Sequence, residues 1–117
     1  MKRYRSPEGF RGFSFTAHGL QCRVYQYEDH ASRESWWCGV VGVPQDHELF
    51  GVDCMRIQGA TVRDDLTISD LVDGDWLIGF DTNQSDRAFR CEHAIREVLT
   101  LAEQISEGIL QIEGVRQ

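Results

Sequence analysis

Apolar and polar residues alternate in two neighbouring stretches near the beginning of the chain, and this period of two is typical of half-buried β-strands. In residues 13–17, Phe13, Phe15 and Ala17 fall on one face, and residues 20–27 alternate in the same way. His18-Gly19 separates the two stretches and favours a tight turn, because glycine takes a positive φ without steric cost. The pattern therefore predicts a β-hairpin.

A continuous apolar run follows, Ser35-Trp36-Trp37-Cys38-Gly39-Val40-Val41-Gly42-Val43-Pro44. It is too short for a globular helix, is rich in aromatic and β-branched residues, and is closed by a proline, all of which favour a strand. We expect it to be the central strand, with one side packed under a helix. Residues 75–81 form a second strand of core quality, and Asp73-Gly74 before them predicts a tight turn.

The pattern is less regular between these two core strands. Residues 45–51 suggest an ordered loop or a single helical turn ahead of Gly51. Residues 52–57 suggest a short edge strand with Val52, Cys54 and Arg56 on one side, which residues 58–62 can extend. We expect one short helical turn at 67–71.

One long amphipathic helix is predicted towards the C-terminal end, capped by Ser85 or Asp86 and stopped by Gly108. Its apolar residues recur at three- and four-residue spacing and form one stripe: Ala88, Cys91, Ala94, Ile95, Val98, Leu99, Ala102 and Ile105. An antiparallel sheet of four to five strands with this helix on one face buries both apolar surfaces. The predicted fold class is therefore α+β.

A chain of 117 residues suits a single domain, which we place at residues 10–117 after a flexible N-terminal arm at residues 1–9. With 41% hydrophobic and 26% charged residues, the composition is that of an ordinary globular protein. No apolar run approaches the ~20 residues that span a bilayer. Because the basic first residues lead into Ser6-Pro7-Glu8-Gly9 and not into an apolar core, we expect no secretory signal, no membrane contact and a cytoplasmic protein.

The four cysteines, Cys22, Cys38, Cys54 and Cys91, are widely spaced and include no C-x-x-C pair. Since no secretory signal is expected, we interpret them as buried thiols and keep disulfides or zinc binding as the alternatives.

Glycines interrupt the two core strands at Gly39, Gly42 and Gly79. A glycine weakens a strand unless an aromatic ring uses the space, and Trp36, Trp37 and Trp76 supply candidate rings. Packing is the simpler interpretation. The alternative is a ligand or partner lying across the sheet, with one of these tryptophans stacking on it.

Negative charge is concentrated in one part of the chain, although the net charge is only −7. Seven aspartates and no lysine or arginine lie between Asp64 and Asp86. A compact acidic face repels nucleic-acid phosphates and attracts a basic protein surface, so we expect a protein partner and no direct nucleic-acid binding. The alternative is a set of solvated aspartates that start turns and cap elements.

No constellation in the sequence requires a particular chemistry. His30 and His47 have carboxylates beside them and fall in predicted loops, but no H-x-x-x-H or H-E-x-x-H spacing is present, so surface histidines are the better interpretation. Asp73-Gly74-Asp75 lacks the order of a calcium loop, and a turn before a strand explains it more simply. We therefore expect no catalytic residue, no metal and no cofactor.

The run from Trp36 to Pro44, followed by His47-Glu48-Leu49-Phe50-Gly51, by Gly79-Phe80-Asp81 and by a closing helix, resembles small uncharacterised proteins of tailed bacteriophages and prophages. Those carry W-Y-C-G-Y-V-x-V-P, H-P-x-x-G, H-G-G-L-T and G-F-D-C-x-H-x-x-D in the same order, and the resemblance covers about two-thirds of this chain. The histidine of H-G-G and the C-x-H residues are replaced here by Gln58 and by Thr82-Asn83-Gln84. The shared residues are therefore interpreted as scaffold, and no catalytic residue is transferred.

The resemblance implies a phage origin, and small acidic phage proteins often act on host machinery. The leading hypothesis is a non-enzymatic inhibitor of a host defence system, similar to an anti-CRISPR protein, that binds a basic host surface. Its candidate partner-binding residues are Asp46, Glu48, Asp64, Asp65, Asp70, Asp73 and Asp75.

Two other classes stay open. One is a small-molecule or nucleotide-signal binder that stacks a base on Trp36, Trp37 or Trp76, with phosphates held by Arg23, Arg56 or Arg63, although no Gly-rich phosphate loop is visible. The other is a metal-dependent enzyme that uses the loop histidines. An exposed edge strand or aromatic patch would also allow two copies to pair, so a homodimer is a further expectation.

Overall fold

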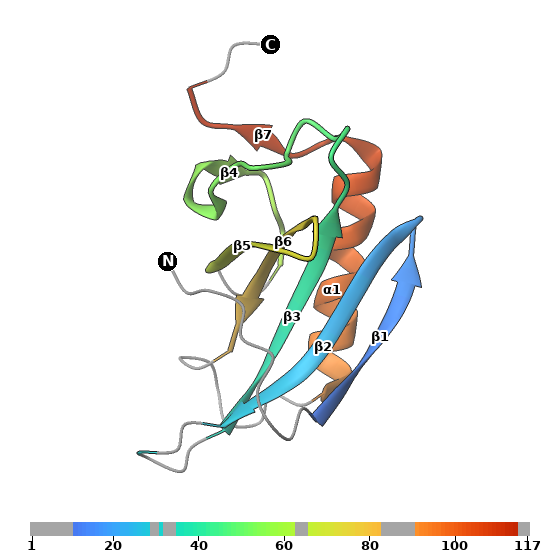
Figure 1. Cartoon of the computed structure of the whole chain (residues 1–117), viewed down its shortest axis with the longest axis vertical. Coiled ribbons are helices and arrows are strands. Elements are labelled where there is room, and N and C mark those ends of the chain that lie inside the picture. The colour runs from blue at the N-terminus through green and yellow to red at the C-terminus, as the bar shows by residue number, and fades with distance from the viewer. Residues whose placement is uncertain (1–10, 29–30, 32–34, 63–65, 83–90, 115–117) are drawn as a thin grey trace.

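The structure is a computed structural model that describes residues 11–28, 31, 35–62, 66–82 and 91–114. It is an α+β fold with a five-stranded antiparallel sheet and one C-terminal helix (Figure 1). The sheet has the order β1-β2-β3-β6-β5, so the predicted central strand does lie in the middle. Its strands are β1 (Arg11–Ala17), β2 (Leu20–Glu28), β3 (Ser35–Val43), β5 (Ile68–Val72) and β6 (Asp75–Asp81).

Both predicted tight turns are present. In the β1–β2 turn, His18 and Gly19 have φ values of 52° and 75°, and in the β5–β6 turn Asp73 and Gly74 have 51° and 86°. Two consecutive positive φ values define a turn whose twist matches that of the flanking strands. These turns fix the register of each hairpin, with Ala17 opposite Leu20 and Val72 opposite Asp75.

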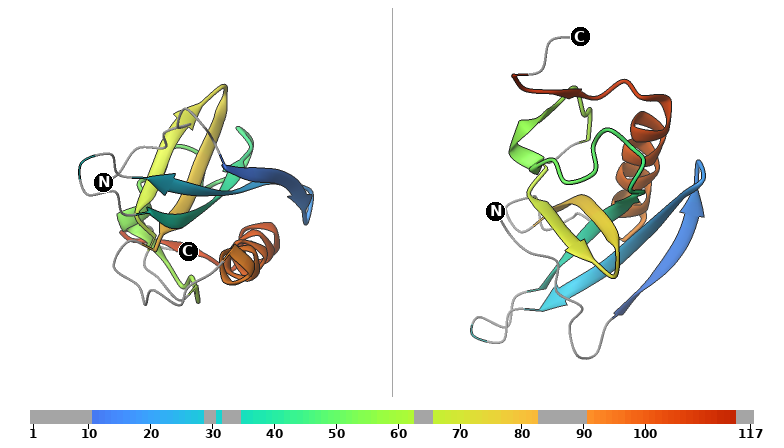
Figure 2. Two further views of the ribbon diagram at one scale, coloured as in Figure 1. Left: turned by 90° about the horizontal axis from the view of Figure 1, so that it is seen from below. Right: turned by 45° about the horizontal axis from the view of Figure 1, so that its top comes forward.

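The helix α1 (Cys91–Glu107) covers one face of the sheet and contacts β1, β2 and β3 (Figures 1 and 2). The main core lies between them and includes buried side chains from both layers, among them Val24, Val41, Phe80, Val98 and Ile105. The opposite face of the sheet carries a second, smaller apolar cluster. Its buried members are Tyr25, Cys38, Val40, Ile68 and Leu77. The central strand is therefore apolar on both sides.

Close packing explains Gly39 and Gly79, but not against the tryptophan rings that the sequence suggested, and it does not explain Gly42, where an added Cβ would come no closer than 3.5 Å to its neighbours. Gly39 pairs with Phe80 across β3 and β6, and a Cβ built on Gly39 would approach the Phe80 ring to 2.7 Å and collide with the Val98 side chain. A Cβ on Gly79 would come within 2.8 Å of the Val40 Cα. The absent side chain at Gly39 thus lets Phe80 and the helix pack closely against β3, and that at Gly79 lets β6 approach Val40 of β3 on the opposite face.

The segment after β3 differs most from the sequence prediction. Residues 52–57 do not form an edge strand: Cys54–Arg56 is a 3-10 turn (η1), because the Asp53 carboxylate accepts a hydrogen bond from the Met55 N–H at 2.8 Å and ends any extended pairing. Only Ile57–Gln58 is a strand (β4), and it does not continue through residues 59–62. It pairs with β7 (Gln111–Ile112), a strand that the sequence pattern did not indicate.

Residues 67–71 were predicted to form a helical turn, and this prediction was wrong. Residues Ile68–Val72 form the edge strand β5, which pairs with β6 along its whole length. Its alternation is hard to recognise, because Ser69 is fully buried and Leu71 is 56% exposed.

The helix ends where the sequence predicted. Gly108 has a φ of 70°, its N–H donates to the Ile105 carbonyl, and the Ile109 N–H donates to the Gln104 carbonyl. This pair of bonds is the Schellman arrangement that satisfies the last carbonyls of a helix. Within the described residues, no helix has the length and apolar character needed to span a bilayer. The N-terminal arm at 1–9 and the caps Ser85 and Asp86 lie outside the described residues.

All four cysteines are free thiols, and the prediction that they are buried is confirmed for three of them. Cys22, Cys38 and Cys54 are buried, and Cys91 is half-buried at the start of α1. Burial raises the thiol pKa of Cys22, Cys54 and Cys91 above its ordinary value. A raised pKa keeps the thiol protonated and unreactive, which fits a role in packing.

Candidate acidic binding surface

Carboxylates from two segments lie at one end of the sheet, where β3 ends and β6 begins. Asp73 and Asp75 are exposed at the tip of the β5–β6 hairpin, and Asp46 and Glu48 are exposed on the loop that follows β3. Val43 pairs with Trp76, so the end of β3 and the hairpin tip are neighbours. We call the carboxylates of Asp46, Glu48, Asp70, Asp73 and Asp75 the acidic end.

Contacts of Trp76 hold the two segments together. Its indole N–H donates to the Val52 carbonyl at 2.9 Å, and its ring centroid lies 6.4 Å from that of Phe50. Neither residues 42–55 nor residues 66–82 contain a lysine or arginine. The negative charge of the acidic end is therefore not offset by a cation within its own segments.

Some of these carboxylates also have local structural roles. Asp70 accepts a hydrogen bond from the Leu71 N–H at 3.0 Å, and Asp73 occupies a left-handed turn position that aspartate tolerates. On the sheet face that they share, Asp70 and Asp75 are diagonal neighbours, at roughly 7–8 Å by the usual strand geometry. The structure brings these two together with Asp73. Asp64 and Asp65 lie outside the described residues.

One exposed apolar side chain, Leu71, lies near these carboxylates, and a second, Met55, lies towards the opposite end of β5, on the same cleft as Leu66 and Thr67. Met55 in η1 is 73% exposed, and Leu71 in β5 is 56% exposed. The Cys54 N–H donates to the Ser69 hydroxyl at 3.1 Å, which places η1 against β5. Exposed apolar side chains surrounded by charged ones are a feature of protein interaction surfaces. The sequence did not indicate Met55 or Leu71, because both were assigned to the wrong local structure.

The three tryptophans do not form a common stacking site. Trp36 lies on the face opposite the helix and packs against Tyr27, with ring centroids 4.9 Å apart. Trp37 and Trp76 both pack against the main core. Trp76 pairs with Val43, six residues along β3 from Trp37, which corresponds to roughly 20 Å at the usual rise per residue. A base could therefore stack on only one of them.

His47 is not a free surface histidine, contrary to the sequence interpretation. The ring is half-buried, its Nδ1 accepts a hydrogen bond from the Leu49 N–H at 3.1 Å, and its Nε2 lies 3.0 Å from the Ile105 carbonyl. Because Nδ1 is the acceptor, the ring hydrogen is on Nε2 and is donated to Ile105. Both nitrogens are thus used to join the loop to the end of α1, so neither is available to a metal or a substrate.

We expect His47→Ala to lower the free energy of unfolding by about 1–3 kcal/mol, because it removes two hydrogen bonds and leaves a helix-end carbonyl without this partner. Urea denaturation followed by circular dichroism measures the change. Gln45→Ala, at an exposed position in the same loop, is the matched control and should change stability by less than about 0.5 kcal/mol. Equal effects of the two substitutions would contradict the structural role of His47.

His30, the other candidate histidine, lies outside the described residues. Among the residues that the structure does describe, no group of three or more histidine, cysteine or acidic side chains is arranged to hold a metal ion.

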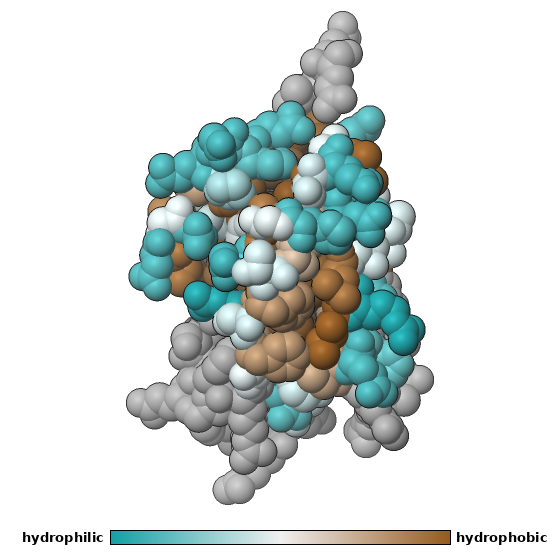
Figure 3. All heavy atoms as spheres, turned by 90° about the vertical axis from the view of Figure 1, so that its right-hand side faces the viewer, coloured by the Kyte–Doolittle hydropathy of each residue, from teal (hydrophilic) through white to brown (hydrophobic). Residues whose placement is uncertain are grey.

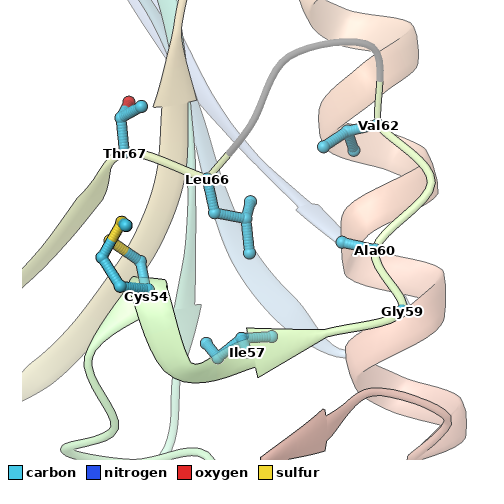
Figure 4. A pocket seen from close by; sticks show the side chains of 8 residues that line it. Cys54, Ile57, Gly59, Ala60, Val62, Leu66 and Thr67 are labelled. Carbon is cyan, nitrogen blue, oxygen red and sulfur yellow. The ribbon is translucent and has the colours of Figure 1, made fainter. Parts of the chain in front are cut away.

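A cleft of about 340 Å³ opens between η1, β4, the segment that follows β4 and the residues just before β5 (Figure 4). The side chains of Ala60 and Val62 point into it from one wall and that of Leu66 from the other. Its described lining carries no charged side chain and none of the tryptophans: Cys54, Met55, Ile57, Gly59, Ala60, Val62, Leu66 and Thr67. The described lining suits a small uncharged molecule and supplies no cation for a nucleotide phosphate, while the candidate Arg63 lies outside the described residues.

Sequence reasoning missed Gln104, which lies behind this wall. Its side chain is 8% exposed, its amide donates to the Thr61 hydroxyl at 2.9 Å, and its carbonyl accepts from the Thr61 N–H at 3.2 Å. These bonds hold residues 59–62 against α1. The sequence signal that could have identified Gln104 is a polar residue at a helix position flanked by the apolar stripe.

No family model, curated protein or solved structure matches this chain.

Proposed function

We propose that the protein is a phage-encoded, non-enzymatic inhibitor of a host defence system, similar in action to an anti-CRISPR protein, working in the host cytoplasm. Its acidic end binds a basic surface of a host protein or nucleoprotein complex. The observation that carries the proposal is the grouping of Asp46, Glu48, Asp73 and Asp75 at one end of the sheet, near the exposed Leu71. The resemblance of the β3 region to phage proteins supplies the biological setting.

Physical considerations support a protein partner at this end. Clustered carboxylates accelerate encounter with a basic surface and repel nucleic acid, while exposed apolar side chains supply contacts that exclude water. Defence proteins that hold nucleic acid carry basic grooves to bind phosphates, so an acidic surface competes for the same positions. Both ring nitrogens of His47 make hydrogen bonds within the chain, so the alternative of a metal-dependent enzyme cannot use this histidine.

Affinity capture followed by a salt titration tests the proposal. The tagged protein should retain a basic host defence component from a lysate at about 0.1 M salt and release it as the salt approaches about 1 M, because the Debye length falls from about 10 Å to about 3 Å. Purified components of a CRISPR effector, with and without guide RNA, then identify the subunit bound. Binding that is insensitive to salt would contradict the electrostatic mechanism.

The uncharged character of the described cleft lining favours a second candidate function, the binding of a small apolar molecule. A thermal-shift screen with nucleotides and with small uncharged compounds separates the possibilities. If this candidate holds, uncharged compounds raise the melting temperature and nucleotides do not, and replacing Ala60 with Trp removes the effect by filling the cleft.

A further inference from the structure

The strand β1 is an open edge of the sheet. In the strand order β1-β2-β3-β6-β5 it is terminal, and within the described residues β2 is its one strand partner. Gly12, Phe13, Ser14 and Thr16 are all exposed. An edge strand with unpaired backbone groups is a template for adding another strand.

The register of the β1–β2 hairpin identifies which backbone groups face outwards. Ala17 and Leu20 flank a two-residue turn and form a hydrogen-bonded pair, and such pairs alternate with non-hydrogen-bonded ones along an antiparallel ladder. Phe13 and Phe15 therefore bond to β2. The N–H and C=O groups of Gly12, Ser14 and Thr16 point away from it.

The same edge is apolar on the side that faces the helix. Phe13 is 41% exposed, Leu99 on the nearby flank of α1 is 40% exposed, and the side chains of Phe15, Ala17 and Ile95 are only partly buried against the core. Figure 3 shows hydrophobic side chains gathered in a strip on this side of the molecule, bordered by hydrophilic ones. We call Phe13, Phe15, Ala17, Ile95 and Leu99 the apolar edge.

The sequence of β1 is complementary to itself. If two copies of β1 pair antiparallel about Ser14, then Ser14 faces Ser14 of the other copy, Gly12 faces Thr16, and Phe13 faces Phe15. The outward backbone groups of Gly12, Ser14 and Thr16 then meet their counterparts, and each Phe13–Phe15 pair occupies a non-hydrogen-bonded position, where opposed side chains are closest. Residues 12–17 carry no charge that would oppose this pairing.

The other edge of the sheet is different. The strand β5 carries Asp70 and ends at Asp73, and a charged edge discourages strand addition. Of the two edges of this sheet, as far as its residues are described, the β1 edge is the one that combines open backbone groups, small side chains on one face and aromatic side chains on the other. The β1 strand of a second copy can pair with the open backbone groups and match both the small and the aromatic side chains. Because a two-fold axis relates the two copies, each contributes the same surface.

We propose that the protein forms a symmetric homodimer in which the β1 strands of two copies pair antiparallel about Ser14, joining the two five-stranded sheets into one continuous sheet. Phe13 of each copy packs on Phe15 of the other, and the two strips of the apolar edge cover one another. The acidic end lies away from this interface, so the dimer presents two copies of it.

Sedimentation velocity over a range of concentrations tests this. The wild type should have twice the 13.4 kDa mass of one chain. Ser14→Lys places two ammonium groups face to face on the axis and should raise the dimer dissociation constant at least about tenfold. Ser14→Asp should weaken the dimer less than Ser14→Lys. Arg23 lies opposite Ser14 on β2 and offsets part of the added negative charge.

The decisive experiment mixes the Ser14→Lys and Ser14→Asp proteins. The lysine of one copy faces the aspartate of the other only if the axis passes through Ser14, so mixing should restore a heterodimer that either tag recovers. Gln58→Lys, at an exposed strand position away from β1, is the control and should leave the dimer intact. A monomeric wild type at about 0.1 mM, a Ser14→Lys protein that is still dimeric, or a mixture that fails to associate would each overturn the proposal. Circular dichroism confirms that each variant is folded.

Discussion

Phe80→Ala should lower the free energy of unfolding by about 3–5 kcal/mol. The Phe80 side chain is fully buried, and its ring lies over Gly39 on the neighbouring strand beneath α1. Truncation removes apolar contact area and leaves a cavity that a strand glycine cannot fill, because Gly39 has no side chain to move into the space. The same loss of unfolding free energy should be measured by probes of the sheet and of the helix, since the site joins the two.

Urea denaturation monitored by circular dichroism measures this loss, with Leu71→Ala as the matched control on the neighbouring strand β5. Leu71 is 56% exposed, so its truncation should cost less than about 1 kcal/mol. Gly39→Ala is also destabilising in the wild type, and part of its cost should disappear in a Phe80→Ala background, because the ring no longer blocks the added methyl group. Equal losses for Phe80→Ala and Leu71→Ala would contradict the packing described.

Replacing Asp70, Asp73 and Asp75 together by asparagine should lower the association rate with the basic partner by about tenfold or more, while leaving the fold intact. Asparagine keeps the oxygen that Asp70 offers to the Leu71 N–H and tolerates the positive φ at Asp73. The substitution therefore removes charge and little else. Surface plasmon resonance at two salt concentrations measures the rates.

A second triple variant, in which Glu92, Glu103 and Glu107 become glutamine, removes the same number of charges from exposed positions on α1. It should leave the association rate within about twofold of the wild type, because it spares the hairpin. If the two triple variants behave alike, net charge and not the acidic end governs binding.

The core of the fold is predictable from local pattern. Residues 35–43 and 75–81 are apolar on both faces, and the turns at His18-Gly19 and Asp73-Gly74 lie between alternating or apolar runs. The amphipathic stripe of α1 ends at a glycine. In these segments, propensity, periodicity and turn chemistry agree, so a local pattern is sufficient.

The region from Val52 to Val72 could not be predicted in the same way, because tertiary contacts decide its structure. Asp53 caps η1 with its own side chain, and Gln104, 43 residues away, holds Thr61 in place. In β5, Ser69 is buried as a hydrogen-bond partner and Leu71 is exposed, which obscures the usual alternation. A short β4–β7 pairing has too few residues to leave a periodic signal.

The candidate site was predictable in composition but not in arrangement. The density of aspartates is visible in the sequence, whereas the approach of Asp46 and Glu48 to the hairpin depends on the pairing of Val43 with Trp76. The role of His47 depends on Ile105, which is 58 residues away, and no local feature of the sequence indicates such a partner.

Phage plating on a host with a CRISPR system that targets the phage tests the central claim most directly. The strains compared express the wild type, the Asp70/Asp73/Asp75 triple variant or the Glu92/Glu103/Glu107 triple variant at equal levels. We predict that the wild type and the α1 variant restore plating on the targeting host, and that the variant of the acidic end does not. Full restoration by the variant of the acidic end, or no restoration by the wild type, would contradict the proposed function.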